Sequence, residues 1–519
     1  MPLAADPVRQ ASKPYDELMR LLRDAATLHS VQTLLGWDQE TIMPHAGGPL
    51  RADQLAAMSG VVHKAWTAPR IGELLQTCAA DAAVMADPGA AANIREAQRE
   101  YDRATKLPTE LVQEMAQTFS QSIEVWREAR GKSDFAAFAP WLEKVVALNR
   151  RKAECYGVPK PTLPGETTGL YDALLDEYEQ GMTAWRVDRV FRPLRERLTP
   201  LIAAIASAKK RPDGAFLDVG APEPAQVAFN RFVAEAVGYD FNGGRLDVST
   251  HPFSESVGPG DIRMTTRYNE ARAMDSVFTT LHESGHSLYE QGLPKAERFG
   301  QPLATYISLG IHESQSRMWE NFIGRSPAFW KWALPHAARI MGPAFGRFTV
   351  EQAYGASNLV KPHFIRVESD EATYNLHIML RFDLERALIA GDLKVKDLPG
   401  VWNERMKSDL GLTVPEARLG CLQDVHWSMG AIGYFSTYSL GNCYAAQLWE
   451  TMLREMPDME DRHSRGEFAP TLAWLKDKIH RHGRLYRAEE LCKKITGQGL
   501  GHEALMRHLE GKLRPIYGI

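Results

Sequence analysis

The chain has 519 residues, 44% of them hydrophobic, and a formal net charge of −4, which allows a large core and argues against disorder. The mixed charge argues against nucleic acid or an anionic membrane as the main partner. The N-terminus has no apolar core of a signal peptide, and no eighteen consecutive residues are apolar, so we expect a cytoplasmic protein.

Helical periodicity dominates the chain from its start. In "YDELMRLLRDAATLH", Leu18, Leu22 and Ala25 recur at the three-to-four spacing of a buried helical stripe. The same pattern predicts helices over 109–130, 191–208 and 224–237. The Pro- and Gly-rich stretch "PKPTLPGETTG" predicts a loop between helices.

One region breaks the helical pattern. Within 243–268, "RLDVS" and "IRMTTRY" are typical of two short strands, which we expect to be joined by a long connection. No repeat or low-complexity linker divides the chain. The sequence therefore predicts an all-α protein with a small β element, forming one unit over 1–519.

The stretch that follows, "FTTLHESGHSLYE", carries His282 and His286 four residues apart, with Glu283 after the first histidine. On a helix this spacing directs both imidazoles to one side, where they can supply half of a tetrahedral zinc site. Glu283 then lies beside the pair as a proton acceptor, the HExxH arrangement. The alternative is a solvated helix face. Gly285 indicates a close neighbour, a ligand or simple helix packing.

A catalytic zinc needs a third protein ligand, and Glu313 in "YISLGIHESQSRMWEN" is the best candidate. Its neighbours Ile307 and Ile311 are expected to be buried, and a carboxylate in apolar surroundings needs a cation. The alternative is an ion pair between Glu313 and Arg317, one turn apart on a surface helix.

Six motifs in fixed order carry a resemblance to a known family. They are HPF (251–253), DxRxT (261–265), HExxH (282–286), HESQ (312–315), IRxxSD (365–370) and GxxQDxHW (420–427). This series resembles that of the carboxypeptidase Taq family of helical zinc metallocarboxypeptidases, and the likeness covers essentially the whole chain. Departures are mild: Ser369 replaces a common alanine, and Ser254 and Ser436 stand where we expect Thr and Pro.

The resemblance implies a saddle-like, two-lobed helical fold with a deep central groove and one metal ion per subunit. That metal is Zn²⁺ or Co²⁺, which the His/His/Glu set does not distinguish. A homodimer acting on peptides with a free C-terminus is also implied, without nucleic acid or membrane partners. Residues 1–519 would then be a single catalytic unit of two lobes flanking the groove.

Recognition of a C-terminal carboxylate calls for an arginine, and Arg366 is our first candidate. We expect Asp370 to hold Arg366, and a polar stripe that continues to Tyr374 and His377 to face a cavity. The alternative is an ordinary helical Arg–Asp pair. Arg263 is the second candidate, with a structural pair as its alternative. His251 is kept as a substrate-binding candidate without assigned chemistry.

Near the C-terminus, "GCLQDVHWSMGAIGYFSTYSL" supplies candidates for stabilising the oxyanion: His426, Tyr434 and Tyr438. Gln423 and Asp424 are expected to contact either these groups or the substrate. The alternative is that the aromatic residues are core and that His426 is a buried, hydrogen-bonded histidine. The resemblance favours His426 and leaves the choice between the tyrosines open.

The residues together predict a metal-dependent carboxypeptidase with Glu283 as general base, acting on peptide C-termini with broad specificity. Two other functions stay open. An oligoendopeptidase would share the metal centre but would not need Arg366. A non-catalytic scaffold would normally have four protein ligands to a structural zinc, whereas three are found here.

Overall fold

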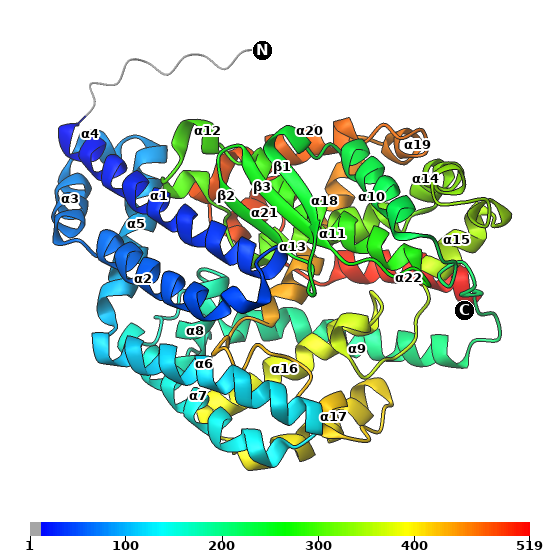
Figure 1. The fold of residues 1–519 in the computed structure, drawn as a ribbon, viewed down its shortest axis with the longest axis horizontal. Helices are drawn as coiled ribbons and strands as arrows, with labels where there is room; N and C mark the ends of the chain where they lie inside the picture. The colour runs from blue at the N-terminus through cyan, green and yellow to red at the C-terminus, as the bar shows by residue number, and fades with distance from the viewer. Residues whose placement is uncertain (1–11) are drawn as a thin grey trace.

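Helices form most of the computed structural model, which describes residues 12–519 (Figure 1). The α-helices are α1 (Lys13–Thr41), α2 (Gly48–Trp66), α3 (Pro69–Ala80), α4 (Ala82–Met85), α5 (Pro88–Lys106), α6 (Thr109–Lys132), α7 (Phe135–Tyr156), α8 (Leu170–Tyr178), α9 (Ala184–Ser207), α10 (Glu223–Val237), α11 (Ala273–Gly292), α12 (Lys295–Arg298), α13 (Leu309–Arg317), α14 (Pro327–Ile340), α15 (Val350–Ser357), α16 (Thr373–Ala390), α17 (Leu398–Leu410), α18 (Ser436–Glu455), α19 (Met459–His463), α20 (Ala469–Lys478), α21 (Ala488–Thr496) and α22 (Glu503–Tyr517). The strands are β1 (Gly244–Val248), β2 (Ser254–Gly258) and β3 (Asp261–Thr266).

The helices predicted from periodicity are confirmed. In α1, Leu18, Leu22 and Ala25 are buried along one side. The ranges 109–130, 191–208 and 224–237 correspond to α6, α9 and α10. The Pro- and Gly-rich loop connects α7 to α8, as expected. The predicted all-α fold with a small β element is therefore correct.

The β element differs from the prediction in one respect. The stretch expected to be a long connection contains β2, and the sheet order is β1-β3-β2. β3 pairs in parallel with β1 and antiparallel with β2. The β2 sequence, "SESVG", has small polar residues and no alternation of apolar side chains, so its strand conformation comes from pairing with β3 rather than from local preference.

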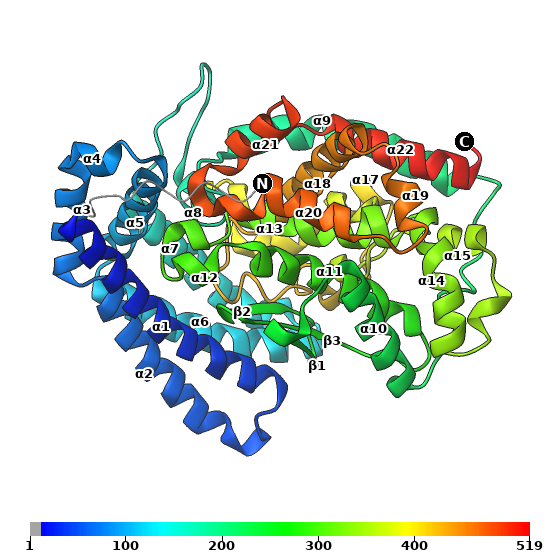
Figure 2. The same cartoon turned by 90° about the horizontal axis from the view of Figure 1, so that it is seen from above.

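Two hydrophobic clusters flank a groove. A small one joins α1, α3, α4 and α5, and the main one joins most elements from α7 to α22. The groove, about 1000 Å³, is lined by α1, α2 and α5 on one side and by β2, α11 and α13 on the other. Figure 2 shows α1 and α2 to one side of the body that contains α11, α13 and α18, and Trp37 near the end of α1 packs on Phe253 just before β2.

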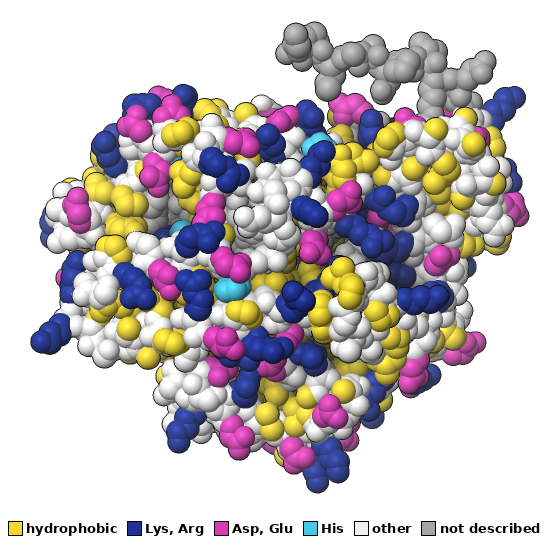
Figure 3. Space-filling model, turned by 180° about the vertical axis from the view of Figure 1, so that it is seen from behind, with side chains coloured by type: hydrophobic (Ala, Val, Ile, Leu, Met, Phe, Trp, Pro, Cys, Tyr) yellow, Lys and Arg dark blue, Asp and Glu magenta, His cyan; other side chains and the backbone are white. Residues whose placement is uncertain are grey.

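The surface is mixed in character. On the face shown in Figure 3, basic and acidic side chains are interspersed, as the small net charge predicts. No helix within residues 12–519 is long and apolar enough to span a membrane.

Candidate metal centre and active-site groove

Helix α11 carries both histidines of the HExxH motif. Its apolar side chains, including Val277, Leu281 and Leu288, are buried in the main core. His282 and His286 project from the opposite side and line the groove. The two histidines therefore have the orientation that the four-residue spacing predicts. They face the groove and not bulk solvent, so the alternative of a solvated helix face is wrong.

Helix α13 brings Glu313 to the two histidines. It begins after Ser308, whose hydroxyl accepts a hydrogen bond from the Ile311 amide. The buried Glu179 carboxylate also fixes this end, accepting from the Ser308 hydroxyl and the Gly310 amide. The bond from Gly310 satisfies an amide at the helix N-terminus that has no partner within the helix. Glu313, 5% exposed, is thus held one turn into a firmly anchored helix.

Two glycines allow α13 to lie close to its neighbours. A Cβ on Gly285 of α11 would lie 2.5 Å from the Gln315 carbonyl oxygen, and one on Gly441 of α18 would lie 2.7 Å from Cβ of Glu313. Neither distance is tolerated between real atoms. Gly285 is therefore explained by close helix packing, one of the options that the sequence left open.

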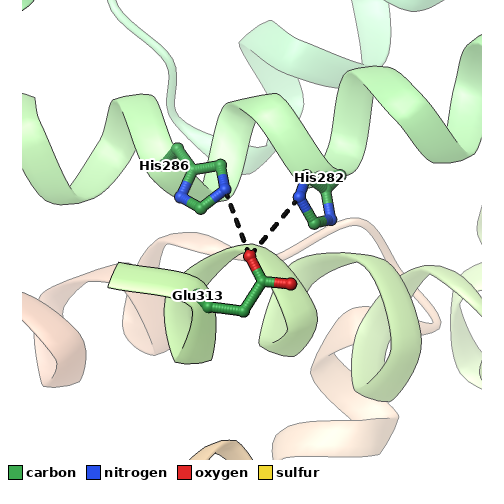
Figure 4. Close-up of side chains that lie close together, drawn as sticks. All are labelled: His282, His286 and Glu313. Atoms are coloured by element: carbon green, nitrogen blue, oxygen red, sulfur yellow. Dashed lines mark ion pairs between the residues drawn. The ribbon is translucent and has the colours of Figure 1, made fainter. Parts of the chain in front are cut away.

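The metal centre, defined here as His282, His286 and Glu313, has converging donor atoms (Figure 4). Oε2 of Glu313 lies 3.7 Å from Nε2 of His282 and 3.4 Å from Nε2 of His286. One donor atom from each of the three residues lies within 4.8 Å of the others. Two imidazoles and one carboxylate are a donor set that suits a divalent cation with an open coordination position, so these residues fit a catalytic metal.

The second nitrogen of His282 is bonded to a carboxylate. Its Nδ1 lies 2.9 Å from Oε2 of Glu320, which belongs to a π-helical turn, η4 (Met318–Gly324). Arg317 bridges Glu313 and Glu320, and Arg325 also donates to Glu320. Despite burial, these cations hold the pKa of Glu320 well below its usual range. The ionised carboxylate accepts from Nδ1–H and leaves Nε2 directed at Glu313.

The second nitrogen of His286 is bonded to another histidine. Its Nδ1 lies 2.5 Å from Nδ1 of His312, whose Nε2 lies 2.9 Å from Oε1 of Glu290. Glu290 also accepts from Lys295. An ionised Glu290 requires Nε2–H on His312, whose Nδ1 then accepts from Nδ1–H of His286. Burial lowers the pKa of His286 to about 3, so the ring is neutral and its Nε2 is a donor for metal.

Glu283 is buried and lines the groove beside His282. No hydrogen bond to its carboxylate comes from another group of residues 12–519, in contrast to Glu290, Glu313 and Glu320. Burial raises its pKa to about 7. An unpaired carboxylate with a high pKa, directed into a groove, is suited to proton transfer.

Tyr434 and Tyr438 line the groove, and His426 lies behind them. The Tyr438 hydroxyl is 3.4 Å from Nε2 of His426, and the His426 and Tyr434 ring centroids are 5.2 Å apart. Burial lowers the pKa of His426 to about 3, so its ring is neutral. The structure thus brings all three predicted residues together, and the two tyrosines are the ones that line the groove.

The expected pairing of Arg366 with Asp370 is wrong. Arg366 lies in a short 3-10 turn, η6 (Arg366–Glu368), outside α16, and Asp370 instead caps α16 by accepting from the Thr373 amide. The two residues are therefore not on one helix, and no polar stripe runs from Arg366 to His377. The helix begins only after the extended backbone at Ser369.

Arg366 belongs instead to the arginine cluster, defined here as Arg366, Arg381 and Asp424. Nε and Nη2 of Arg366 each lie 3.0 Å from Oδ1 of Asp424, and Nε of Arg381 lies 2.7 Å from Oδ2. Arg366 also donates to the Tyr374 hydroxyl. Arg366 and Arg381 are buried, the Asp424 side chain is 9% exposed, and none of the three lines the groove, although Cζ of Arg366 is 5.0 Å from the ring centroid of Tyr438.

The remaining substrate-binding candidates lie away from the groove surface. Gln423 accepts from the Arg366 amide and donates to the Gly420 carbonyl, so it shapes the loop before His426. Arg263 is paired with Asp261, the structural alternative considered above. His251 is exposed, whereas its neighbours Pro252 and Phe253 line the groove.

Sequence reasoning missed the side chains that hold the two histidines. Glu290 follows His286 by one helical turn, as His286 follows His282, and this four-residue series was a usable signal. Glu320 lies seven residues after Glu313, near the same side of a buried helix. His312 was noted only as a neighbour of Glu313, because its contact with His286 comes from the packing of α13 on α11.

A groove lined by helices, an HExxH helix and a glutamate on a second helix that converges on the two histidines are together typical of a helical metallopeptidase. The model of the carboxypeptidase Taq (M32) metallopeptidase family matches residues 17–513. Thermostable carboxypeptidase 1 of Thermus thermophilus is 43% identical over 508 residues, covering 97% of this chain and 99% of that protein. Carboxypeptidase 1 of Bacillus subtilis is 36% identical over 504 residues, covering 96% and 98%.

Solved structures agree. The M32 carboxypeptidase of Deinococcus radiodurans superposes with a TM-score of 0.93 at 36% identity, covering 98% of this chain and all of that one. A Pyrococcus furiosus carboxypeptidase gives 0.91 at 35% identity, covering 97% and 99%. The chain belongs to the carboxypeptidase Taq (M32) family, and it is a metallocarboxypeptidase.

Proposed function

We propose that the protein removes amino acids one at a time from peptide C-termini, with Glu283 as general base and then general acid. The observation that carries this proposal is the unpaired Glu283 carboxylate, which lines the groove next to the converging donors of the metal centre. A divalent metal held by His282, His286 and Glu313 supplies a Lewis acid and increases the acidity of water.

The chain's own groups then account for the proton transfers. Glu283 accepts a proton from the attacking water and later delivers it to the leaving amine. The Tyr434 and Tyr438 hydroxyl groups donate to the oxyanion as it forms, and neutral His426 orients Tyr438 through the 3.4 Å contact. The packing of these groups against the main core keeps them in place for the reaction.

We propose that Arg366 supplies the positive charge that selects a free C-terminal carboxylate. The arginine cluster contains two guanidinium groups and one carboxylate, hence an excess buried positive charge. Tyr438, which lines the groove, separates this charge from the substrate. Asp424 is then a partner of Arg366, and Gln423, Asp370, Arg263 and His251 act on the shape of the groove wall.

Zinc is the proposed metal, with cobalt as the alternative, because the donor set is two imidazoles and one carboxylate. A cytoplasmic homodimer is proposed from the family resemblance and the composition. Metal analysis of protein purified without added metal, together with light scattering after size exclusion, tests the metal and the dimer.

The deciding experiment compares one peptide as its free acid and as its C-terminal amide, with wild type and Glu283→Gln, both loaded with metal. Stepwise release from the acid alone, abolished by Glu283→Gln, is expected. Internal cleavage of both forms would mean an oligoendopeptidase. No cleavage of either form by metal-loaded wild type would leave a metal-binding scaffold.

A further inference from the structure

We propose that Arg484 is a second anion-recognition residue in the groove and binds a carboxylate of the peptide. The proposal deepens the peptidase function above and rests on it. Among the described lining residues, the permanently cationic side chains are Lys295 and Arg484, whereas Arg366 lies outside the lining.

Lys295 and Arg484 differ in how many of their N–H donors already have a partner within the protein. Lys295 is bound to Glu290, which is itself buried and bonded to His312, and it also donates to Ser256. Its ammonium is thereby enclosed in the network behind His286. Two of the three N–H donors of Lys295 are thus in use, and its charge is balanced by the buried Glu290 carboxylate.

Arg484 keeps part of its guanidinium open. Its Nε donates to the Tyr306 carbonyl and its Nη1 pairs with Glu100. No group of residues 12–519 forms a hydrogen bond with Nη2 of Arg484, and both Arg484 and Glu100 line the groove. The Glu100 side chain is 38% exposed and the Arg484 side chain 17% exposed, so water reaches the carboxylate side of the pair and a substrate carboxylate can compete with Glu100 for the guanidinium. A fork of Nη1 and Nη2 then matches two carboxylate oxygens.

The position of Arg484 is fixed close to the metal centre. Its Cζ lies 5.8 Å from the Tyr306 ring centroid, and that ring stands edge-on to His312, with centroids 5.1 Å apart. His312 is the residue bonded to His286. Arg484 therefore lies on the His286 side of the centre, whereas Arg317 and the Tyr374 hydroxyl connect the His282 side to Arg366.

The backbone around Arg484 is set by a close contact. Gly483 has φ +48°, and a Cβ there would lie 1.8 Å from the Leu303 carbonyl oxygen. This approach presses the segment η9 (His480–Leu485) onto the segment η3 (Pro302–Ala304). Arg95 of α5 also donates to the carbonyls of Arg484 and Leu485. These contacts hold the segment in place without the ion pair between Arg484 and Glu100. A substrate carboxylate can therefore replace Glu100 as the partner of Arg484 without loss of the local fold.

The carboxylate has two possible sources, the C-terminal α-carboxylate or an acidic side chain. Four otherwise identical peptides separate them: Glu or Gln at the C-terminal position, and Glu or Gln at the position before it. KM is measured for wild type, Arg484→Gln and Glu100→Gln. Dissociation constants are measured by calorimetry in the metal-loaded Glu283→Gln background, where no turnover occurs.

Arg484→Gln is expected to weaken binding roughly tenfold to hundredfold, the range for loss of a charged hydrogen-bonded pair. Glu100→Gln is expected to strengthen binding by roughly twofold to fivefold, because it removes the competing carboxylate. An effect on all four peptides identifies the α-carboxylate as the ligand. An effect confined to the Glu-containing peptides identifies the side chain.

Two controls keep the test decisive. Arg481→Gln removes an exposed arginine of the same segment, paired with Asp477, and should change nothing. Arg484→Lys keeps the charge but not the fork, and replaces Arg484→Gln if that variant fails to fold. Affinities within twofold of wild type for all peptides, or changes of the same sign in Arg484→Gln and Glu100→Gln, would overturn the proposal. Absence of hydrolysis by wild type counts against the proposed function alone, since calorimetry still decides the role of Arg484.

Discussion

Two buried charged networks flank the groove, and they differ in what their hydrogen bonds leave free. In the metal centre, Glu320 and His312 occupy the outer nitrogens of the two histidines, so the inner nitrogens converge with Glu313 on one point. In the arginine cluster, Asp424 is shared by two guanidiniums and nothing faces the groove directly. The comparison teaches that burial and charge alone do not identify a candidate reactive site. The distinguishing feature is a set of atoms that can bind a ligand and that have no hydrogen-bonding partner outside the site among residues 12–519, here the inner nitrogens of the two histidines.

Among the variants that test this contrast, Asp424→Asn is expected to have the largest effect, a loss of stability. The change leaves two buried guanidiniums without a carboxylate, and breaking a buried pair costs about 3–5 kcal/mol. Thermal denaturation of metal-free protein should show the loss. Asp383→Asn is the matched control, because Asp383 also pairs with two arginines but is 30% exposed, and it should cost less than about 1 kcal/mol. Equal decreases in melting temperature for the two variants would mean that the arginine cluster is no more sensitive to loss of its carboxylate than a partly exposed ion pair.

A second buried carboxyl, Glu385, should make stability depend on pH. It accepts from Trp427, from the Tyr171 hydroxyl and from the Gly433 amide, and no cation of residues 12–519 forms an ion pair with it. Burial raises its pKa from 4.5 to about 7. The folded state therefore binds this proton more tightly than the unfolded chain, so the stabilisation is complete below about pH 4.5. It is lost as pH rises to about 7, by up to about 3 kcal/mol.

The measurement is the free energy of unfolding between pH 5 and 8 for wild type and Glu385→Gln. The slope with pH, rather than the absolute level, carries the prediction, since the amide also loses an acceptor for the Gly433 amide. Wild type should lose stability relative to Glu385→Gln across this window. Parallel curves would mean that Glu385 has an ordinary pKa in the folded protein.

In the metal centre, His312→Phe should weaken metal binding by roughly tenfold to hundredfold, because the ring that orients His286 no longer accepts its Nδ1–H. Competition with a chelator of known affinity measures the change. Tyr306→Phe is the control, since Tyr306 packs on the same His312 ring but has no hydrogen bond to a metal ligand. If the two variants bind metal alike, the His286–His312 contact does not set the affinity.

The smallest expected effect concerns the close approach of α11 and α13. Gly285→Ala would place a methyl group 2.5 Å from the Gln315 carbonyl oxygen, and such overpacking costs about 1–3 kcal/mol. The separation of the helices should also weaken metal binding. Gly60→Ala, in α2 with nothing within 4 Å, should instead stabilise by up to about 1 kcal/mol. Denaturation midpoints of both variants test the opposite signs.

The convergence of His282, His286 and Glu313 could be predicted because most of its geometry is local. The spacing of His282 and His286 determines their common direction on any helix, and Glu313 follows in a segment whose neighbours Ile307 and Ile311 are buried, as expected. The Glu313–Arg317 pair offered as an alternative also exists, so the two interpretations of Glu313 were compatible. Helix positions followed from periodicity for the same local reason.

Contacts across the fold were not predictable in this way. Arg366 was assigned to Asp370 because they lie four residues apart, yet its partner Asp424 lies 58 residues further along the chain. The strand β2 exists through pairing with β3 and has no apolar alternation of its own. Both errors come from features that depend on tertiary packing, which a single sequence does not encode locally.

The π-helical turn after α13 has a consequence for how this protein can change over evolution. A π turn holds one residue more than an α turn, and Glu320 and Arg325 reach each other across it. Each residue of a helix advances the side chains by about 100°, so a one-residue deletion between Glu313 and Glu320 would turn Glu320 away from His282. The stretch must therefore keep its length as well as Glu320: the number of residues between Glu313 and Glu320 is itself a condition for the contact with His282.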